Sequence, residues 1–204
     1  MKKDLIILVA DKNTEFAVKG LLSRYHALKI RQVVSDLYVH PERDPGCLLK
    51  CDSFLRPFIN NYMHAFVIFD REGCGREQNS REDLEKEVEE RLAHSGWGNR
   101  AEVIILDPEL EIWVWSDSPH VDSILGWRDK QPDLKTWLKL NGYFDAQRNK
   151  PYRPKEVLEE ALRQATKARS SSLYLQLAKL VSLERCTDSA FLKFKAGLQY
   201  WFAD

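Results

Sequence analysis

Long apolar runs are missing from this sequence. No stretch approaches the roughly 20 consecutive apolar residues that a transmembrane helix needs. The apolar run near the amino terminus, from Leu5 to Val9, is too short for a secretory signal, and charged residues follow it at once. We therefore expect a soluble, cytoplasmic protein that does not enter a membrane.

An excess of charge of either sign is also missing, and cysteine is scarce. The 31 Lys and Arg residues balance the 31 Asp and Glu residues, so bulk charge does not indicate a nucleic-acid partner and any basic surface must be local. The spacing of the four cysteines argues against a zinc site and for free thiols: Cys47, Cys51, Cys74 and Cys186. The usual glycine-rich phosphate loop is absent, which argues against an ordinary nucleotide-binding enzyme.

The sequence does contain a repeated pattern of apolar strands that end in acids. Each apolar run indicates a strand buried on both faces, as in a parallel sheet sandwiched by helices, so we predict an α/β fold. The runs and the acids that follow them are 5–9 with Asp11 and Glu15, 65–69 with Asp70 and Glu72, and 102–106 with Asp107, Glu109 and Glu111.

Asp11 and Glu15 flank the expected start of the first helix. Asn13 or Thr14 can cap that helix, which places Glu15 in the first turn, where the helix dipole favours an anion. Ordinary capping and first-turn acids therefore explain this segment as well as a ligand site does. The ligand site is favoured by position, because ligands bind at the carboxyl edge of open α/β sheets.

Asp70 and Glu72 strengthen the prediction of a cation site. Side chains alternate along a strand, so these two carboxylates point the same way and can share a cation. Clustered like charges raise one another's pKa and cost stability unless a cation neutralises them. Oxygen ligands without nearby histidine or cysteine suit Mg²⁺ or Mn²⁺ better than zinc.

Three other segments give less specific expectations. Alternation over residues 28–39 indicates a strand that ends near Asp36. Residues 80–97 indicate a helix capped by Ser80, whose dense charge is most simply a solvated surface. A local excess of basic residues between 147 and 172, which includes Arg148, can either hold a phosphodiester or form a plain solvated face.

The last part of the chain is rich in turns and tryptophan and then helical. Trp127 and Trp137 are more typical of a core than of a surface on which bases stack. We expect a helical carboxyl-terminal region. The predicted organisation is an α/β domain over residues 1–116, with Trp-rich loops and carboxyl-terminal helices over 117–204 packed on it.

The order of the acids resembles the Toprim fold, the metal-binding α/β domain of topoisomerases, primases and the OLD family of nucleases. In that fold an acid ends the first strand, another lies near the start of the following helix, and a later strand ends in an acid-x-acid pair. The carboxyl-terminal part looks like small bacterial Toprim-like proteins, some of them encoded among phage-defence genes. The positions that match the Toprim pattern are Asp11, Thr14-Glu15 and Asp70-Arg71-Glu72.

This resemblance implies a Mg²⁺-dependent or Mn²⁺-dependent phosphodiesterase, most specifically a nuclease of a bacterial antiviral defence system acting on DNA or RNA. The roles implied for the residues are Asp70 bridging metals, Asp11 and Glu72 completing the ligand set, Glu15 holding a second metal or orienting the attacking water, and Glu109 and Glu111 as outer or second-metal ligands. Lys12, or a lysine from the carboxyl-terminal helices, would stabilise the charge that develops on the phosphate.

An alternative follows from the way the chain departs from the Toprim pattern. Asp11-Lys12 stands where the family usually has glutamate and glycine, and Glu72 stands where it has aspartate. Lys12 can neutralise the acids in place of a cation. The alternative is therefore a catalytically degenerate Toprim-like subunit that binds proteins or nucleic acid within a multi-component defence complex.

Overall fold

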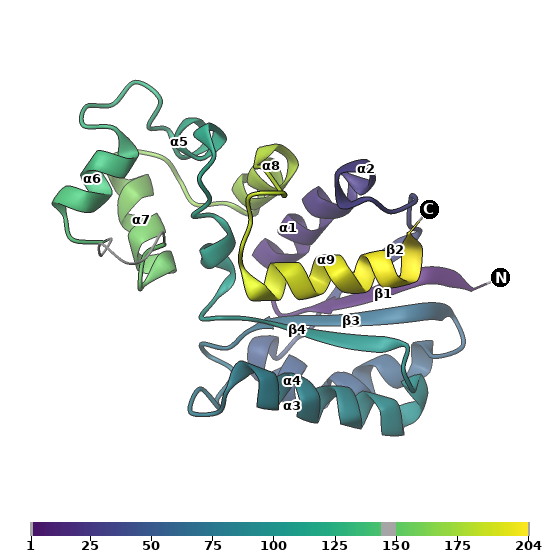
Figure 1. Ribbon diagram of the computed structural model, residues 1–204. Helices are drawn as coiled ribbons and strands as arrows, with labels where there is room; N and C mark the ends of the chain where they lie inside the picture. Colours follow the sequence, from purple (N-terminus) through teal and green to yellow (C-terminus); the bar gives the residue numbers. More distant parts are fainter. Residues whose placement is uncertain (1, 144–149, 204) are drawn as a thin grey trace.

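The computed structural model describes residues 2–143 and 150–203. Strands alternate with helices over most of this range (Figure 1), and η denotes a short 3-10 or π-helical turn. The elements are β1 (Lys3–Val9), α1 (Lys12–Leu22), α2 (Tyr25–Leu28), β2 (Ser35–Val39), α3 (Arg43–Leu55), η1 (Arg56–Phe58), β3 (Tyr62–Asp70), α4 (Arg81–Leu92), η2 (Ala93–Trp97), β4 (Ala101–Leu106), η3 (Leu110–Trp113), α5 (Pro119–Leu125), α6 (Leu134–Leu140), α7 (Pro154–Gln164), α8 (Ser171–Leu180) and α9 (Ser189–Phe202).

The four strands form one parallel sheet in the order β2-β1-β3-β4. In the register of the sheet, Ile7 of β1 lies between Leu37 of β2 and Phe66 of β3. The predicted α/β class with a parallel sheet is thereby confirmed. The chain moves from β1 to one side to form β2 and then crosses to the other side to form β3. The carboxyl ends of β1 and β3 therefore flank the topological switch point, where ligands bind in open α/β sheets.

Helices cover both faces of the sheet (Figure 1). Leu5, Ile7 and Val9 of β1 pack in the core on the side of α1, α8 and α9. Ile6 and Leu8 pack in the core on the side of α3 and α4. All five side chains are fully buried, which explains why this strand is an uninterrupted apolar run rather than an alternating one.

The carboxyl-terminal helices complete the layer that contains α1. The ring of Phe194 in α9 packs edge-on against Phe66 of β3, with 5.0 Å between their centroids. Helix α8 packs along α1, and α5, α6 and α7 form a lobe beyond the carboxyl edge of the sheet (Figure 1). The predicted domain boundary at residue 116 stays a prediction. Helices α8 and α9 lie beyond it and share their core with the strands.

Trp127 of the lobe lies in the core, and Trp137 is partly buried and packs against it. The indole nitrogen of Trp127 donates a hydrogen bond to the carbonyl of Ala161 at 3.0 Å. The ring of Trp127 is 4 % exposed and its centroid lies 4.9 Å from that of Trp137. This placement agrees with the interpretation of these residues as core rather than as base-stacking surface.

Gly20 sets the distance between α1 and α8. A Cβ atom added there would lie 2.7 Å from Cβ of Ala178 and 2.9 Å from the carbonyl oxygen of Leu175. We expect Gly20→Ala to destabilise the protein by about 1–2 kcal/mol, because the clash outweighs the gain in helix propensity. Thermal unfolding measures this, and adding Ala178→Gly should recover part of the loss. A melting temperature at or above that of the wild type would contradict this account of the packing.

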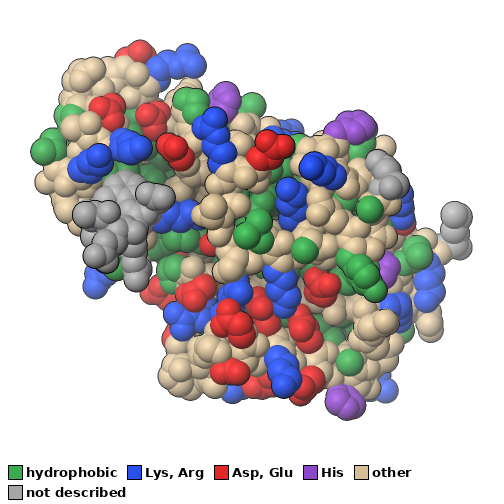
Figure 2. All heavy atoms as spheres, viewed as in Figure 1, with side chains coloured by type: hydrophobic (Ala, Val, Ile, Leu, Met, Phe, Trp, Pro, Cys, Tyr) green, Lys and Arg blue, Asp and Glu red, His purple; other side chains and the backbone are tan. Residues whose placement is uncertain are grey.

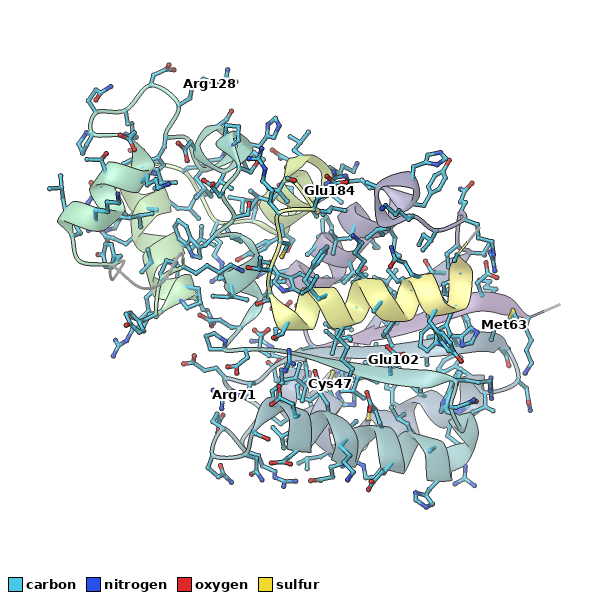
Figure 3. All side chains as sticks on the ribbon, in the orientation of Figure 1. Cys47, Met63, Arg71, Glu102, Arg128 and Glu184 are labelled. Atoms are coloured by element: carbon cyan, nitrogen blue, oxygen red, sulfur yellow. The ribbon has the colours of Figure 1, made fainter. Side chains whose placement is uncertain are left out.

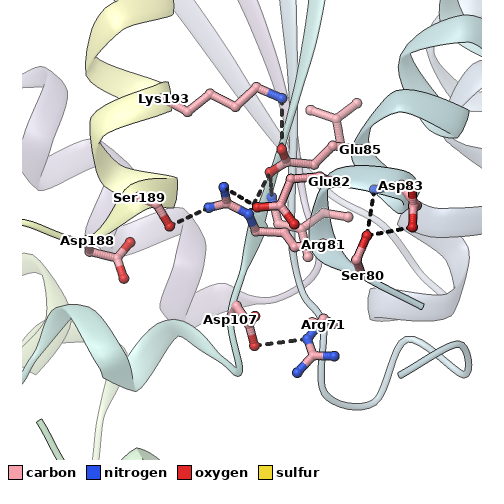
Figure 4. A network of polar contacts seen from close by, with 12 residues as sticks. Arg71, Ser80, Arg81, Glu82, Asp83, Glu85, Asp107, Asp188, Ser189 and Lys193 are labelled. Atoms are coloured by element: carbon pink, nitrogen blue, oxygen red, sulfur yellow. Dashed lines mark hydrogen bonds and ion pairs between the residues drawn. The ribbon is translucent and has the colours of Figure 1, made fainter. Parts of the chain in front are cut away.

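The outer edge of the sheet at β4 is closed by side chains. Glu85 and Glu89 of α4 accept hydrogen bonds from the backbone N–H groups of Ile105 and Val103, each at 3.0 Å. Lys193 of α9 lies 3.0 Å from Glu85 and 2.7 Å from Glu89. Acidic and basic side chains gather over this part of the surface (Figure 2), and Figure 4 shows the contact between Lys193 and Glu85.

The interpretation of the whole α4 surface as merely solvated is therefore wrong for two of its acids. Glu85 is 4 % exposed, and both carboxylates occupy backbone donors that would otherwise be open on an edge strand. An edge without such protection is a template for aggregation. The predicted cap is confirmed, because the Ser80 side chain accepts a hydrogen bond from the Asp83 amide.

The second strand is shifted relative to its prediction. It runs from Ser35 to Val39 and does not end near Asp36. Asp36 pairs with Lys3 at 2.7 Å within the sheet. The whole strand is only half-buried because it lies at the edge of the sheet, so it shows no apolar run.

Arg148 of the predicted basic segment lies outside the described residues.

None of the helices in the described part of the chain has both the length and the apolar character of a membrane span.

Candidate metal centre

The carboxyl ends of the strands face the α5–α7 lobe. Figure 3 shows Arg71, which directly follows β3, at this edge of the sheet and Met63, near the start of β3, at the opposite edge. Asp11 follows β1 here, and Asp70 is the last residue of β3. The acids that follow β4 begin at the same edge, because Asp70 pairs with Leu106 in the parallel register.

Three carboxylates converge at this edge. One oxygen from each of Asp70, Glu109 and Glu111 lies within 4.8 Å of the others. Glu109 is 5 % exposed and Glu111 is 2 % exposed, whereas Asp70 is half-buried. Two oxygens on opposite sides of a bound Mg²⁺ or Ca²⁺ lie about 4–5 Å apart. This triad could therefore hold a metal ion with little rearrangement.

Neighbouring groups orient each carboxylate of the triad. The amide of Leu110 donates to Oδ1 of Asp70, and the amide of Lys155 donates to Oε1 of Glu109, both at 2.9 Å. Among the described residues, the hydrogen bonds to each of these carboxylates fall on one oxygen. The other oxygen of Glu109 lies 3.7 Å from the ammonium group of Lys155. Hydrogen bonds of this kind position metal ligands in known sites.

Glu111 has the strongest partners of the three. Its Oε1 accepts a hydrogen bond from Nη2 of Arg169 at 2.5 Å and another from the hydroxyl of Tyr174. Arg169 also lies 2.6 Å from Glu159. The α8 region thus contributes both groups that hold Glu111, so residues far apart in the sequence build one site.

The electrostatics of the triad favour a cation. Burial, followed by repulsion from Asp44 and Glu111, raises the pKa of Asp70 well above its usual range. Burial raises the pKa of Glu109 to about 7, and the charge of Glu111 adds to this shift. A raised pKa means that ionising these carboxylates costs the folded protein free energy. A bound cation removes that cost.

Two further acids border the triad. Asp11 caps α1 and accepts hydrogen bonds from the amide and the hydroxyl of Thr14. Oδ1 of Asp44, in the first turn of α3, accepts a hydrogen bond from the amide of Asp70 at 2.9 Å. Burial raises the pKa of Asp44, and the charge of Asp11 raises it further.

The residue that caps α1 is Asp11, whereas the sequence predicts Asn13 or Thr14.

The sequence prediction did not include Asp44. Its signal is the turn-rich segment after β2, where an acid follows a strand as in the other three cases. The sequence pattern ends this strand near Asp36, whereas β2 ends at Val39, so the pattern does not put Asp44 at the same edge. The hydrogen bond from the Asp70 amide to the Asp44 carboxylate links the end of β3 to the start of α3.

Glu15 and Lys12 lie together, outside the triad. Glu15 is 6 % exposed and forms ion pairs at 2.6 Å with both Lys12 and Lys19. Burial opposes ionisation of Glu15, but the hydrogen bonds from the two lysines outweigh it and lower its pKa. Among the described residues, the acids close enough to share one ion do not include Glu15. Whether it binds a second metal stays a prediction.

Glu72 lies at the rim of the site. Its side chain is exposed, its amide donates to the carbonyl of Pro108 at 2.9 Å, and its charge helps to raise the pKa of Glu109. Asp70 therefore meets Glu109 and Glu111 more closely than it meets its predicted partner Glu72. Asp70 meets the acids after β4 because the loop after β4 folds back over the end of β3. There the Leu110 amide donates a hydrogen bond to Asp70.

The fold and the site define an α/β protein with an acidic cluster at the switch point of a parallel sheet. Comparison of the chain with protein-family models, with curated proteins and with solved structures finds no match. The functional argument therefore depends on the chemistry of the site itself.

Proposed function

We propose that this protein is a Mg²⁺-dependent or Mn²⁺-dependent phosphodiesterase, and that its substrate is DNA or RNA. The observation that carries the proposal is the convergence of Asp70, Glu109 and Glu111 within 4.8 Å at the carboxyl edge of the sheet. The narrower proposal, a Toprim-like nuclease in antiviral defence, rests in addition on a resemblance. The order of the acids after β1 and β3 resembles the Toprim pattern.

In this proposal Asp70, Glu109 and Glu111 hold the ion, and Asp11 and Asp44 add negative charge beside it. A bound divalent ion polarises a phosphoryl oxygen and lowers the pKa of a bound water. The chain supplies the orientation of the ligands through the amides of Leu110 and Lys155 and through Arg169. These contacts hold the carboxylates in place before an ion arrives.

A cation for the substrate is available at the start of α7. The ammonium group of Lys155 lies 3.7 Å from Oε2 of Glu109, and its side chain is 47 % exposed. In the proposed enzyme Lys155 binds a phosphate oxygen next to the ion and stabilises the charge that develops there. The two candidates from the sequence for this role are Lys12 and a lysine of the carboxyl-terminal helices. Lys155 is of the second kind, and Lys12 pairs with Glu15.

One observation favours the alternative of a degenerate subunit that binds a protein or nucleic-acid partner. Glu15 is fully engaged by Lys12 and Lys19, and Arg169 already places a positive charge on Glu111. Two of the predicted metal ligands are therefore partly neutralised by the chain itself. In this alternative the remaining carboxylates bind no ion, and neither stability nor nucleic-acid cleavage depends on a metal.

Metal dependence distinguishes the proposed enzyme from the alternative of a degenerate subunit. If the proposal is correct, Mg²⁺ or Mn²⁺ raises the melting temperature at pH 8, a chelator reverses the rise, and single-stranded or double-stranded DNA or RNA is cleaved only with the metal. No change in melting temperature together with intact nucleic acids would contradict the proposal. Binding of a partner protein or nucleic acid without cleavage would support the alternative.

The pKa of Glu109 gives a pH prediction. The folded state keeps this proton up to about pH 7, whereas the unfolded state loses it near its ordinary value of 4.5. Ionisation of Glu109 should therefore lower the stability of the metal-free protein by about 3 kcal/mol as the pH rises between these values. His40 and His64, whose pKa values burial lowers, act in the opposite direction.

Comparison with Glu109→Gln isolates this effect. The glutamine keeps an oxygen for the Lys155 amide but does not titrate. The difference in stability between the variant and the wild type should grow as the pH is raised from about 5 to about 8, measured by urea unfolding with chelator present. A difference that is independent of pH would show that Glu109 has an ordinary pKa.

A further inference from the structure

Two loops meet beside the acidic triad at the carboxyl edge of the sheet. Residues 71–80 follow Asp70 and lead from β3 to α4. Residues 107–109 lead from β4 to η3, and Glu109 is the last of them. The carboxylates of Asp70 and Glu109 both belong to the group that could hold an ion. Their separation therefore depends on the contacts that hold the two loops together.

Backbone hydrogen bonds and one ion pair join these loops. The Arg71 amide donates to the carbonyl of Leu106 at 2.8 Å, and the Glu72 amide donates to the carbonyl of Pro108 at 2.9 Å. The side chain of Arg71 adds a third connection, because its Nε atom donates to Oδ1 of Asp107 at 2.9 Å (Figure 4). The ion pair thus joins the residue directly after one ligand of the triad to a residue two positions before another.

The guanidinium group of Arg71 is also held from its other side. Its Nη1 atom donates to the carbonyl of Glu77 at 2.8 Å and lies 3.5 Å from the carbonyl oxygen of Asn79. Both carbonyls belong to the segment that leads into α4. A planar guanidinium group can donate in two directions at once. Arg71 therefore connects the loop after β4 to the lead-in of α4, and both contacts fix its own orientation.

The ion pair also accounts for Asp107, an acid that follows a buried strand as Asp11 does. Among the described residues, the acids close enough to share one ion do not include Asp107. Its Oδ1 accepts from Arg71 instead. The charge of Arg71 by itself opposes the binding of a cation at the triad, because like charges repel. A favourable effect of this arginine on the site must therefore come from the contact that it makes.

We propose that Arg71 is a positioning residue of the metal centre, which acts through Asp107 to fix the separation between the carboxylates of Asp70 and Glu109. Groups that hold metal ligands from outside commonly set the affinity for the ion. This inference rests on the proposed function, because it needs an ion at the triad. It adds two residues that touch neither the ion nor the substrate.

Mn²⁺ is the probe, and its binding to the full chain is measured from the electron paramagnetic resonance signal of the free ion. Arg71→Ala should weaken Mn²⁺ binding about tenfold, because the loops lose their side-chain contact. A purely electrostatic effect has the opposite sign, since removal of a positive charge strengthens the binding of a cation. The ion pair is 29 % and 43 % exposed, so its loss should lower the melting temperature in chelator by no more than about 4 °C.

A second variant breaks the same contact from the other side. Asp107→Ala should weaken Mn²⁺ binding to a similar extent, and the double variant should bind no more weakly than the weaker of the two single variants, because both substitutions remove one contact. Arg76→Ala is the matched control. This arginine of the same loop pairs with Glu87 of α4 at 2.7 Å and makes no contact with the loop after β4 among the described residues, so its loss should leave the affinity unchanged.

The outcomes separate this inference from the proposed function. Mn²⁺ binding by Arg71→Ala that equals or exceeds that of the wild type would overturn the inference and leave the proposed function in place. Additive losses in the double variant would also overturn it, because the two residues would then act independently. Failure of the wild type to bind Mn²⁺ would overturn the proposed function, and this inference with it.

Discussion

Asp70→Asn is expected to abolish metal-dependent cleavage and to make the metal-free protein more stable. Asparagine has the same shape, and its carbonyl oxygen can still accept the hydrogen bond from the Leu110 amide. The substitution removes the carboxylate whose pKa is raised by burial and by its acidic neighbours. Stability without metal should increase by about 1–2 kcal/mol, as is common when a strained functional group is removed.

The activity should change in the opposite direction. Loss of a metal ligand removes several kcal/mol of transition-state stabilisation, so we expect the rate of cleavage to fall by about three orders of magnitude or more. Cleavage assays with Mg²⁺ and urea unfolding with chelator measure the two effects on one preparation. The pairing of the two results is diagnostic, because a variant that merely misfolds loses activity and stability together.

Matched substitutions separate the triad from the other acids. Glu90→Gln changes an exposed carboxylate of α4 and should leave both cleavage and stability unchanged. Glu89 is unsuitable as a control, because it binds Lys193 and the Val103 amide. Glu72→Gln tests the predicted acid-x-acid pair and should have a smaller effect than Asp70→Asn. An equal effect of the two substitutions would place Glu72 among the ligands and contradict the geometry of the triad.

The convergence of the acids after β3 and β4 could be predicted because it depends on one strong signal. A long apolar run indicates a buried parallel strand, and parallel strands bring their carboxyl ends to one edge. That reasoning predicts Asp70, Glu109 and Glu111 at the same edge, but it gives Glu109 and Glu111 only as outer or second-metal ligands. It could not give the distances, because these depend on the turn that leads from β4 into η3.

Side-chain partners from distant segments could not be predicted. Glu15 has the spacing of a ligand in the sequence, yet Lys12 and Lys19 lie on the same helical face and neutralise it. Glu85 has the pattern of a solvated residue, yet it is buried against the edge of β4 beside Lys193. The two lysines that pair with Glu15 lie three and four residues away on the same helix, so helical spacing contains that information. The partners of Glu85 come from β4 and α9, and periodicity does not contain that information.

Arg169→Ala is expected to have the largest effect on stability among the substitutions near the triad. Glu111 is 2 % exposed, and within the described part of the chain Arg169 is the cation paired with it. Removing one partner of a buried pair leaves an uncompensated charge, which costs about 3 kcal/mol. The hydroxyl of Tyr174 still donates to Glu111 and limits the loss. Urea unfolding with chelator present measures the change.

A double-mutant cycle identifies the cause of this loss. If the cost arises from the unpaired carboxylate, adding Glu111→Gln to Arg169→Ala should recover about half of it or more, because the neutral amide needs no counter-charge. Arg163→Ala, which removes an exposed arginine paired with Glu160 on α7, should leave stability close to that of the wild type. Additive effects of the two substitutions would show that Arg169 acts through packing alone.

The same variant distinguishes a metal centre from a degenerate one. In Arg169→Ala the triad has lost a positive charge, so a divalent ion that binds there should stabilise the variant more than it stabilises the wild type. Mg²⁺ should then raise the melting temperature of Arg169→Ala by more degrees than that of the wild type, and adding Asp70→Asn should remove the difference. If Mg²⁺ leaves both proteins unchanged, the carboxylates are held by Arg169, Tyr174 and protonation alone, and the alternative of a non-catalytic subunit is favoured.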